Sequence, residues 1–292
     1  MNQKPKSVLF RELLEQPGVL TVPGCYDAIS AIMVEKNGFP VAYMTGFGSS
    51  ASVIGQPDAG IMDFTQMSTH AGNMAHSISI PLVADGDTGY GNAVNVYRTV
   101  KTYAQHEVAA IQLEDQVSPK RCGHTQGKVI VPLNEMLGKL QAALDAAKEK
   151  DIVIIVRTDA RAVEGFDAAL KRCLAFEEAG ADVIFMEAPI SIEEMQKTAK
   201  TIRKPLLANM VEGGETPFLD SIKLDELGFK IGLYPISLLL SVIQTLDSQL
   251  KRMARGEHDQ MIPDQISFAE LKNLVGFPAY DEMQGKYDSI NQ

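Results

Sequence analysis

The stretch DIVIIVRTDA, from Asp151 to Ala160, decides the fold class. Its five consecutive apolar residues, 152–156, are too uniform for a strand with one face in water. They indicate a strand covered on both faces, as in a parallel sheet. The run then ends in Arg157 and Asp159, polar residues that would stand at the carboxyl end of that strand.

Seven further apolar runs repeat this pattern along the chain. They are GVLTVPG (18–24), VAYMTG (41–46), IPLVADGD (80–87), AAIQLED (109–115), ADVIFMEA (181–188), PLLANM (205–210) and FKIGLYP (229–235). Amphipathic segments between the runs predict helices. Eight strand–helix alternations predict an α/β fold, a (β/α)8 TIM barrel, as one domain over residues 1–292. A doubly wound open sheet is the alternative, because sequence alone does not close a barrel.

Two of the predicted helices have clear ends. The segment SIEEMQKTAKTIRK begins with a capping box between Ser191 and Glu194. The segment EGFDAALKRCLAFEEAGA places Cys173 and Leu174 on one apolar face and ends at Gly180. Cys173 is therefore predicted to pack in the core.

The chain continues well beyond the eighth predicted strand. ISLLLSVIQTLDSQLKRMARG predicts a long helix, and residues 262–292 predict further helix. A barrel does not need this tail. We therefore expect residues 262–292 to pack on a neighbouring subunit.

Composition limits the partners. The net charge of −10 over 292 residues makes nucleic acid and anionic membranes poor partners. No run of about 18 apolar residues predicts a membrane span. The start of the sequence has no apolar segment of the signal-peptide kind. Three cysteines without framework spacing are typical of a reducing cytoplasm.

Polar residues gather where successive predicted strands end. In a parallel barrel these carboxyl ends form the active-site face. Single acids at such places also serve as helix caps, but four strands in succession end in this way. The residues are Asp85, Asp87, Glu114, Asp115, Arg157, Asp159, Glu187 and, on the next strand, Asn209.

The segment DGDTGYGN (85–92) predicts a cation site. Asp85 and Asp87 are two residues apart, so on a regular strand they face one side. Their carboxylates would repel each other unless a cation lay between them. Mg²⁺ prefers oxygen ligands and keeps several waters, so one carboxylate is enough for direct binding. Glu114 on the next strand strengthens this interpretation.

The segment EDQVSPKRCGH (114–124) places Cys122 next to Lys120, Arg121 and His124. Neighbouring cations favour the thiolate, so Cys122 could act as a nucleophile or as a proton donor. The alternative is a polar surface loop in which the cysteine is incidental. We expect residues 114–128 to form a mobile gate, because they include many polar residues and two glycines and have little to bury.

These segments resemble the isocitrate lyase/phosphoenolpyruvate mutase superfamily over nearly the whole chain. KRCGH and DGDTGYGN carry the resemblance, in order with PGCYDAISA, YMTGFGSSAS, GQPDAG, RTDA, EAP, ANMVEGG and LYP. The resemblance implies a (β/α)8 barrel and bound Mg²⁺, with Mn²⁺ as a possible substitute. It also implies a homotetramer in which paired subunits swap the last barrel helix. Such a swap would account for the helical tail.

The resemblance also implies residue roles. Asp85 should bind Mg²⁺ directly, while Asp58, Asp87 and Glu114 hold its waters. The family usually has alanine where this chain has Gly86, and glycine would loosen the strand end by up to about 1 kcal/mol. The implied catalytic residues are Cys122, His124, Arg157 and Glu187. The implied substrate-binding residues are Tyr43, Thr45, Gly46, Phe47, Lys120, Arg121, Gly123, Asn209 and Pro235.

KRCGH marks the branch of the superfamily that cleaves carbon–carbon bonds. The implied substrate is a small carboxylic acid, a 2-hydroxy di- or tricarboxylate, whose leaving enolate Cys122 protonates. NMVEGGETP, from Asn209, favours 2,3-dimethylmalate, which gives pyruvate and propionate. Phe47 would fill the space that a third carboxylate needs. The alternatives are 2-methylisocitrate, giving pyruvate and succinate, then oxaloacetate hydrolysis, which Pro235 disfavours.

Two alternatives of other classes remain. A mutase that forms a phosphonate, by carboxyvinyl-carboxyphosphonate or phosphoenolpyruvate chemistry, would give Cys122 no clear role. A non-catalytic member of the family would not need a tuned thiol beside an intact set of acids.

Overall fold

The computed structural model describes residues 4–123, 125, 127–257 and 265–288. The chain forms two compact units, residues 1–241 and 242–292, and each is described by itself. His124, one of the predicted catalytic residues, lies outside the described residues.

The first unit is a closed barrel of eight parallel strands in sequence order, with β8 hydrogen-bonded to β1 through pairs such as Ile231 and Leu20. This closure confirms the barrel over the open sheet. The strands are β1 (Leu20–Cys25), β2 (Ala42–Met44), β3 (Leu82–Asp85), β4 (Ala110–Glu114), β5 (Val153–Thr158), β6 (Val183–Met186), β7 (Leu206–Asn209) and β8 (Ile231–Tyr234).

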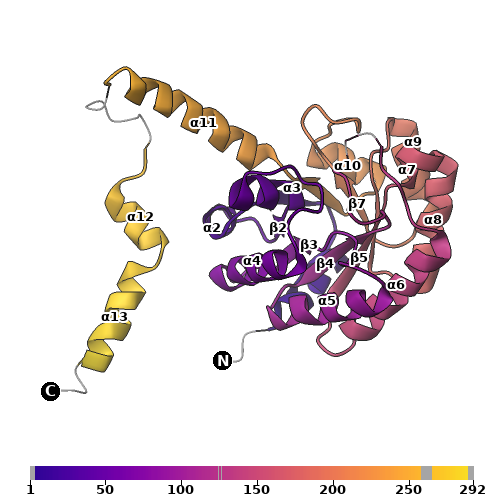
Figure 1. Cartoon of the computed structure of the whole chain (residues 1–292), viewed down its shortest axis with the longest axis horizontal. Coiled ribbons are helices and arrows are strands. Elements are labelled where there is room, and N and C mark those ends of the chain that lie inside the picture. Colours follow the sequence, from indigo (N-terminus) through magenta and orange to yellow (C-terminus); the bar gives the residue numbers. More distant parts are fainter. Residues whose placement is uncertain (1–3, 124, 126, 258–264, 289–292) are drawn as a thin grey trace. The chain divides into compact units, whose positions relative to one another are not determined.

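Helices surround the strands (Figure 1). Ten α-helices and one short π-helix precede α11 among the described residues. They are α1 (Lys6–Glu15), α2 (Ala28–Lys36), α3 (Gly46–Ser49), η1 (Ser50–Ile54), α4 (Phe64–Ser77), α5 (Ala93–Gln105), α6 (Leu133–Ala147), α7 (Ala160–Glu164), α8 (Phe166–Ala179), α9 (Ile192–Thr201) and α10 (Ser221–Leu227). The next helix, α11 (Ser237–Ala254), begins in the first unit and ends in the second.

The strands divide the core in two because their side chains alternate between two faces. Outward residues such as Ile154 and Ile184 belong to a cluster packed with the helices. Inward residues such as Val153, Ile155 and Phe185 form a separate cluster inside the barrel. Both faces of each strand are therefore buried, which explains the uniformly apolar runs in the sequence.

The amino-terminal helix α1 supplies the barrel's inner core with one aromatic side chain. Phe10 is fully buried in the inner cluster, and Leu13 and Leu14 pack against the same cluster. Arg11 pairs with Asp151, at 3.0 Å, and with Asp182, at 2.7 Å, just before β5 and β6 begin. Helix α1 therefore closes the barrel at the amino-terminal ends of the strands.

The structure confirms some of the helix ends that the sequence predicts. Ser191 caps α9, but the Glu194 side chain accepts from the Ile190 backbone and pairs with Arg161 instead of completing a capping box. Gly180 ends α8 with a φ of +102°, as predicted. Cys173 is buried as expected, whereas Leu174 is 40% exposed and its placement on the buried face was wrong. The buried neighbour of Cys173 is Arg172, and Leu174 lies about 100° around the helix on the other side of Cys173.

The second unit contains the end of α11 together with α12 (Phe268–Leu274) and α13 (Phe277–Asp288). A capping box between Ser267 and Glu270 starts α12. This confirms that the tail is helical, while its packing on a neighbouring subunit and the helix swap stay predictions. Exposed apolar side chains of this unit include Ile243, Leu246, Leu250, Phe268, Phe277, Tyr280 and Met283. Across the described ranges, no helix is long and apolar enough to cross a membrane.

Replacing Phe10 with alanine tests the closure of the barrel. Phe10→Ala should lower the free energy of unfolding by about 3–5 kcal/mol, because it empties a buried aromatic site. Chemical denaturation followed by circular dichroism measures this change. Leu174→Ala, on the exposed face of α8, is the control and should cost about 0.5 kcal/mol. Equal costs for the two variants would contradict a closing role for α1.

Candidate active site

A cavity of about 260 Å³ lies at the carboxyl ends of the strands. Most of the predicted site residues line it. They are Tyr43, Thr45, Gly46, Phe47, Asp58, Asp85, Cys122, Gly123, Arg157, Glu187, Asn209 and Pro235, with the further residues Gln112, Thr125, Phe185, Val211, Leu233 and Ile236. Four predicted residues, Asp87, Glu114, Lys120 and Arg121, do not line the cavity itself.

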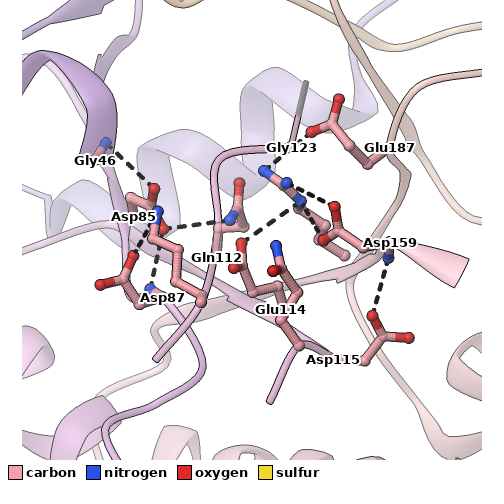
Figure 2. A network of polar contacts seen from close by, with 12 residues as sticks. Gly46, Asp85, Asp87, Gln112, Glu114, Asp115, Gly123, Asp159 and Glu187 are labelled. Carbon is pink, nitrogen blue, oxygen red and sulfur yellow. Dashed lines mark hydrogen bonds and ion pairs between the residues drawn. The ribbon is translucent and has the colours of Figure 1, made fainter. Parts of the chain in front are cut away.

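Asp85 is held by three donors on one side of the cavity (Figure 2). Its carboxylate accepts from the Gly46 backbone at 3.2 Å, the Asp87 backbone at 3.0 Å and Gln112 Nε2 at 3.3 Å. The Tyr43 hydroxyl in turn donates to Gln112 Oε1 at 2.5 Å. The Gly46 N–H that was expected to bind substrate thus points at Asp85, and its role in substrate binding stays a prediction.

Asp87 reaches this cluster by a turn. It follows the end of β3 with a φ of +47°, so the expectation that both aspartates share one face of a regular strand was wrong. Gly86 does more than loosen the strand end. Its N–H donates to the Gln112 carbonyl at 2.9 Å, and an added Cβ would lie 2.8 Å from that oxygen. In this chain an alanine at position 86 would therefore require the Gln112 backbone or the Ile111 side chain to shift.

Lys120 joins two of the predicted acids. Its ammonium is buried and lies 2.6 Å from Asp58 Oδ1 and 3.0 Å from Asp87 Oδ1. Burial lowers the pKa of Lys120, but Asp87 and the neighbouring acids outweigh it and raise the pKa well above its usual value. Burial raises the pKa of Asp87 to about 7, against the opposing effect of Lys120.

Arg157, at the end of β5, is surrounded by the carboxylates of Glu114, Asp159 and Glu187. It donates through Nε and Nη2 to Asp159, at 2.9 Å each, and pairs through Nη1 with Glu187 at 2.9 Å. Its Nε also lies 3.5 Å from Glu114 Oε2. Burial lowers the pKa of Arg157, but the three carboxylates together outweigh this effect and raise the pKa well above its usual value.

The loop that carries Cys122 packs closely on Arg157. A Cβ built on Gly123 would lie 2.3 Å from Arg157 Nη2 and 2.8 Å from the Glu187 carboxylate carbon. Cys122 is half-buried and lines the cavity. Glycine at position 123 therefore lets the loop backbone lie directly against the guanidinium.

The rest of this loop is better anchored than the sequence suggested. Lys120, Gly123 and Lys128 are buried, so the expectation that the loop has little to bury was wrong. The Gln116 side chain binds both the N–H and the carbonyl of Arg121. Arg121 itself is exposed. Mobility of the loop stays a prediction.

Sequence reasoning assigned no site role to Gln112 or Lys128, and it named Asp159 only as a polar residue at the end of its strand. Gln112 precedes Glu114 by two residues inside an apolar strand, so alternation would have placed both on the inner face. Asp159 likewise lies two residues from Arg157, so alternation would have placed these two on the same face as well. Lys128 comes from a loop, where no periodicity predicts direction.

The acids on the β3–β4 side are suited to a cation. Neither oxygen of the buried Glu114 accepts a hydrogen bond from the described residues, and burial raises its pKa well above the usual value. An all-oxygen set with an unsatisfied buried carboxylate fits Mg²⁺. Within the part of the chain that the structure describes, no three acids, cysteines or histidines lie close enough to hold a metal directly. Binding of a metal through Asp85 and water molecules stays a prediction.

The fold and this site define a family. The phosphoenolpyruvate phosphomutase family matches residues 10–254, and the chain belongs to the phosphoenolpyruvate mutase/isocitrate lyase superfamily, as predicted.

Three known proteins are similar over nearly their whole length. 2,3-Dimethylmalate lyase of Eubacterium barkeri is 43% identical, covering 95% of this chain and 96% of that protein. 2-Methylisocitrate lyase of Aeropyrum pernix is 36% identical, covering 96% and 90%. A crystal structure of a 2,3-dimethylmalate lyase superposes with a TM-score of 0.92 at 33% identity, covering 98% and 96%.

Proposed function

We propose that this chain is a Mg²⁺-dependent carbon–carbon lyase that cleaves 2,3-dimethylmalate to pyruvate and propionate. The lyase relatives support the enzyme class. The choice of substrate rests on how charged and apolar residues are distributed around the cavity. Its charged residues come from the ends of β3, β5 and β6 and from Asp58, whereas an apolar wall, formed by Val211, Leu233, Pro235 and Ile236, comes from the ends of β7 and β8.

The charges on the wall imply a bound cation. Arg157 is the only Lys, Arg or His side chain lining the cavity among the described residues. Its guanidinium already faces three carboxylates. Asp58 and Asp85 add negative charge to the wall, and of these Asp58 is paired with Lys120 behind it. A dicarboxylate would be repelled by this arrangement unless a divalent cation compensated it.

Asp85 is the residue best placed to hold Mg²⁺ directly, because its carboxylate both lines the cavity and is fixed by three donors. Asp58, Asp87 and Glu114 would hold the metal's waters. When bound, Mg²⁺ would polarise the C2 oxygen and the adjacent carboxylate of the substrate.

The apolar wall favours a substrate with alkyl groups. The two methyl groups of 2,3-dimethylmalate could lie against Leu233 and Ile236 without loss of hydrogen bonds. The third carboxylate of 2-methylisocitrate would face the same side chains and lose hydration without a partner. Phe47 lines the cavity and is 43% exposed, and its occupation of the space for a third carboxylate stays a prediction. The 36% identity to a 2-methylisocitrate lyase keeps that acid as the second candidate.

The reaction needs one proton acceptor and one proton donor. The C2 hydroxyl loses its proton to a carboxylate of the wall, the C2–C3 electron pair moves to C3, and pyruvate forms. The resulting enediolate of propionate takes a proton at C3 from the Cys122 thiol. Arg157 can stabilise the developing negative charge because its position is fixed before the reaction. We further propose that the protein is cytoplasmic and that it forms a homotetramer, as the family resemblance implies.

A pyruvate-release assay coupled to lactate dehydrogenase tests the substrate. With Mg²⁺ present, kcat/KM for 2,3-dimethylmalate should exceed that for 2-methylisocitrate by about tenfold or more, because a third charge meets the apolar wall. Both acids release pyruvate, so one assay compares them directly. Faster turnover of 2-methylisocitrate would leave the lyase chemistry intact and reject the substrate assignment.

Two aspartate variants test the metal assignment. Asp85→Ala should abolish Mg²⁺ binding measured by calorimetry, while Asp58→Ala should weaken it by about 10–100-fold, as expected for a residue that binds the metal through water. EDTA should remove wild-type activity and added Mg²⁺ should restore it. Equal losses in the two variants would contradict direct binding by Asp85.

Replacing Cys122 tests the proton donor. Cys122→Ser should lower kcat by roughly 100-fold or more, because a hydroxyl is a much weaker acid than a thiol. Mg²⁺ affinity and the melting temperature should not change, and both serve as controls. A variant with near-normal kcat would remove Cys122 from the proton-transfer step.

A further inference from the structure

Lys128 is a buried cation that the proposed chemistry does not use. Its side chain is 2% exposed, and its Nζ lies 3.1 Å from Asp159 Oδ1. The same Nζ donates to the backbone carbonyl of Gly123. A buried ammonium is costly unless its donors are paired. Lys128 meets this requirement by joining the loop that carries Cys122 to the carboxylate that follows β5.

The residue at the β5 end of this link is fixed in place. Asp159 is fully buried and binds Arg157 through both carboxylate oxygens. Its backbone N–H donates to Asp115 Oδ1 at 2.9 Å. Asp115 also accepts from Thr158 at 2.6 Å and from Arg172 at 3.2 Å. Asp159 is therefore a firm support for a residue that approaches from the loop.

The residue at the loop end of the link lies next to the proposed proton donor. The Gly123 carbonyl belongs to the residue after Cys122, and the Gly123 Cα packs against Arg157. Holding this carbonyl restricts the rotation of the Gly123 backbone, which is joined directly to Cys122. The position of the Cys122 thiol then depends on Lys128, although Lys128 does not line the cavity.

We propose that Lys128 is a positioning residue that ties the Gly123 peptide to Asp159 and so holds Cys122 at the cavity. The ammonium suits this position because it can donate to a carbonyl and a carboxylate at once. Loss of the charge should release the loop near Cys122 and leave the barrel intact. The inference concerns the loop, so it can be tested without a substrate, and only its effect on kcat rests on the proposed function.

The experiment compares Lys128→Met with wild type by limited trypsin digestion. Arg121 is exposed and stands directly before Cys122, so cleavage after Arg121 reports on this part of the loop. Mass spectrometry follows the initial rate of that cut. Lys128→Met should be cut about fivefold faster or more, with kcat on 2,3-dimethylmalate reduced about tenfold and Mg²⁺ affinity unchanged.

Lys230→Met is the matched control. Lys230 also donates to two backbone carbonyls, those of Gln16 and Gly18, but it precedes β8 at the opposite end of the barrel. Its loss should change neither the cut after Arg121 nor kcat. Lys128→Gln, which keeps an N–H donor, is measured alongside and replaces Lys128→Met if the latter has no melting transition.

The outcomes are distinct. Faster cleavage together with a lower kcat supports the proposal. Faster cleavage in an enzyme that turns over none of the tested acids supports it too, and places the failure in the proposed function. Cleavage of Lys128→Met and Lys128→Gln at the wild-type rate overturns it, whatever happens to kcat, because Lys128 would then not hold the loop.

Discussion

The candidate site depends on one buried cation, the guanidinium of Arg157. Three carboxylates from three different strand ends converge on it, those of Glu114, Asp159 and Glu187. Without the guanidinium these acids would repel one another in a poorly solvated interior. The pairing sets the positions of β4, β5 and β6 at their carboxyl ends. It also provides the surface on which the Gly123 backbone packs.

The alternation of side chains explains how the barrel makes a polar site from an apolar core. Along β5 the inward residues are Val153, Ile155 and then Arg157, and the first two belong to the inner cluster. Along β6 the inward Phe185 is followed two residues later by Glu187. The same two-residue periodicity thus places apolar side chains inside the barrel and charged side chains at the carboxyl ends of its strands. Folding and site assembly rest on the same pattern.

Much of this was readable from the sequence. All eight strands follow from apolar runs, and the lining residues Asp85, Arg157, Glu187 and Asn209 follow from the polar residues at strand ends. Most of the other predicted lining residues came from the family resemblance. The sequence did not reveal the turn that brings Asp87 beside Lys120, since a positive φ at a non-glycine residue follows from tertiary contacts. It also did not reveal Lys128, because loop residues have no periodicity from which direction can be inferred. The sequence alone does not predict the contacts between segments that are far apart along the chain.

The amide of Gln112 connects the Tyr43 hydroxyl to the Asp85 carboxylate. An amide neither gains nor loses a proton over the pH range in which proteins stay folded. A histidine in the same place would switch between donor patterns near neutrality. The hydrogen bond that Gln112 donates to Asp85 therefore does not depend on the protonation state of its donor. The response of this site to pH therefore falls to titrating groups such as Asp87, whose pKa burial raises to about 7.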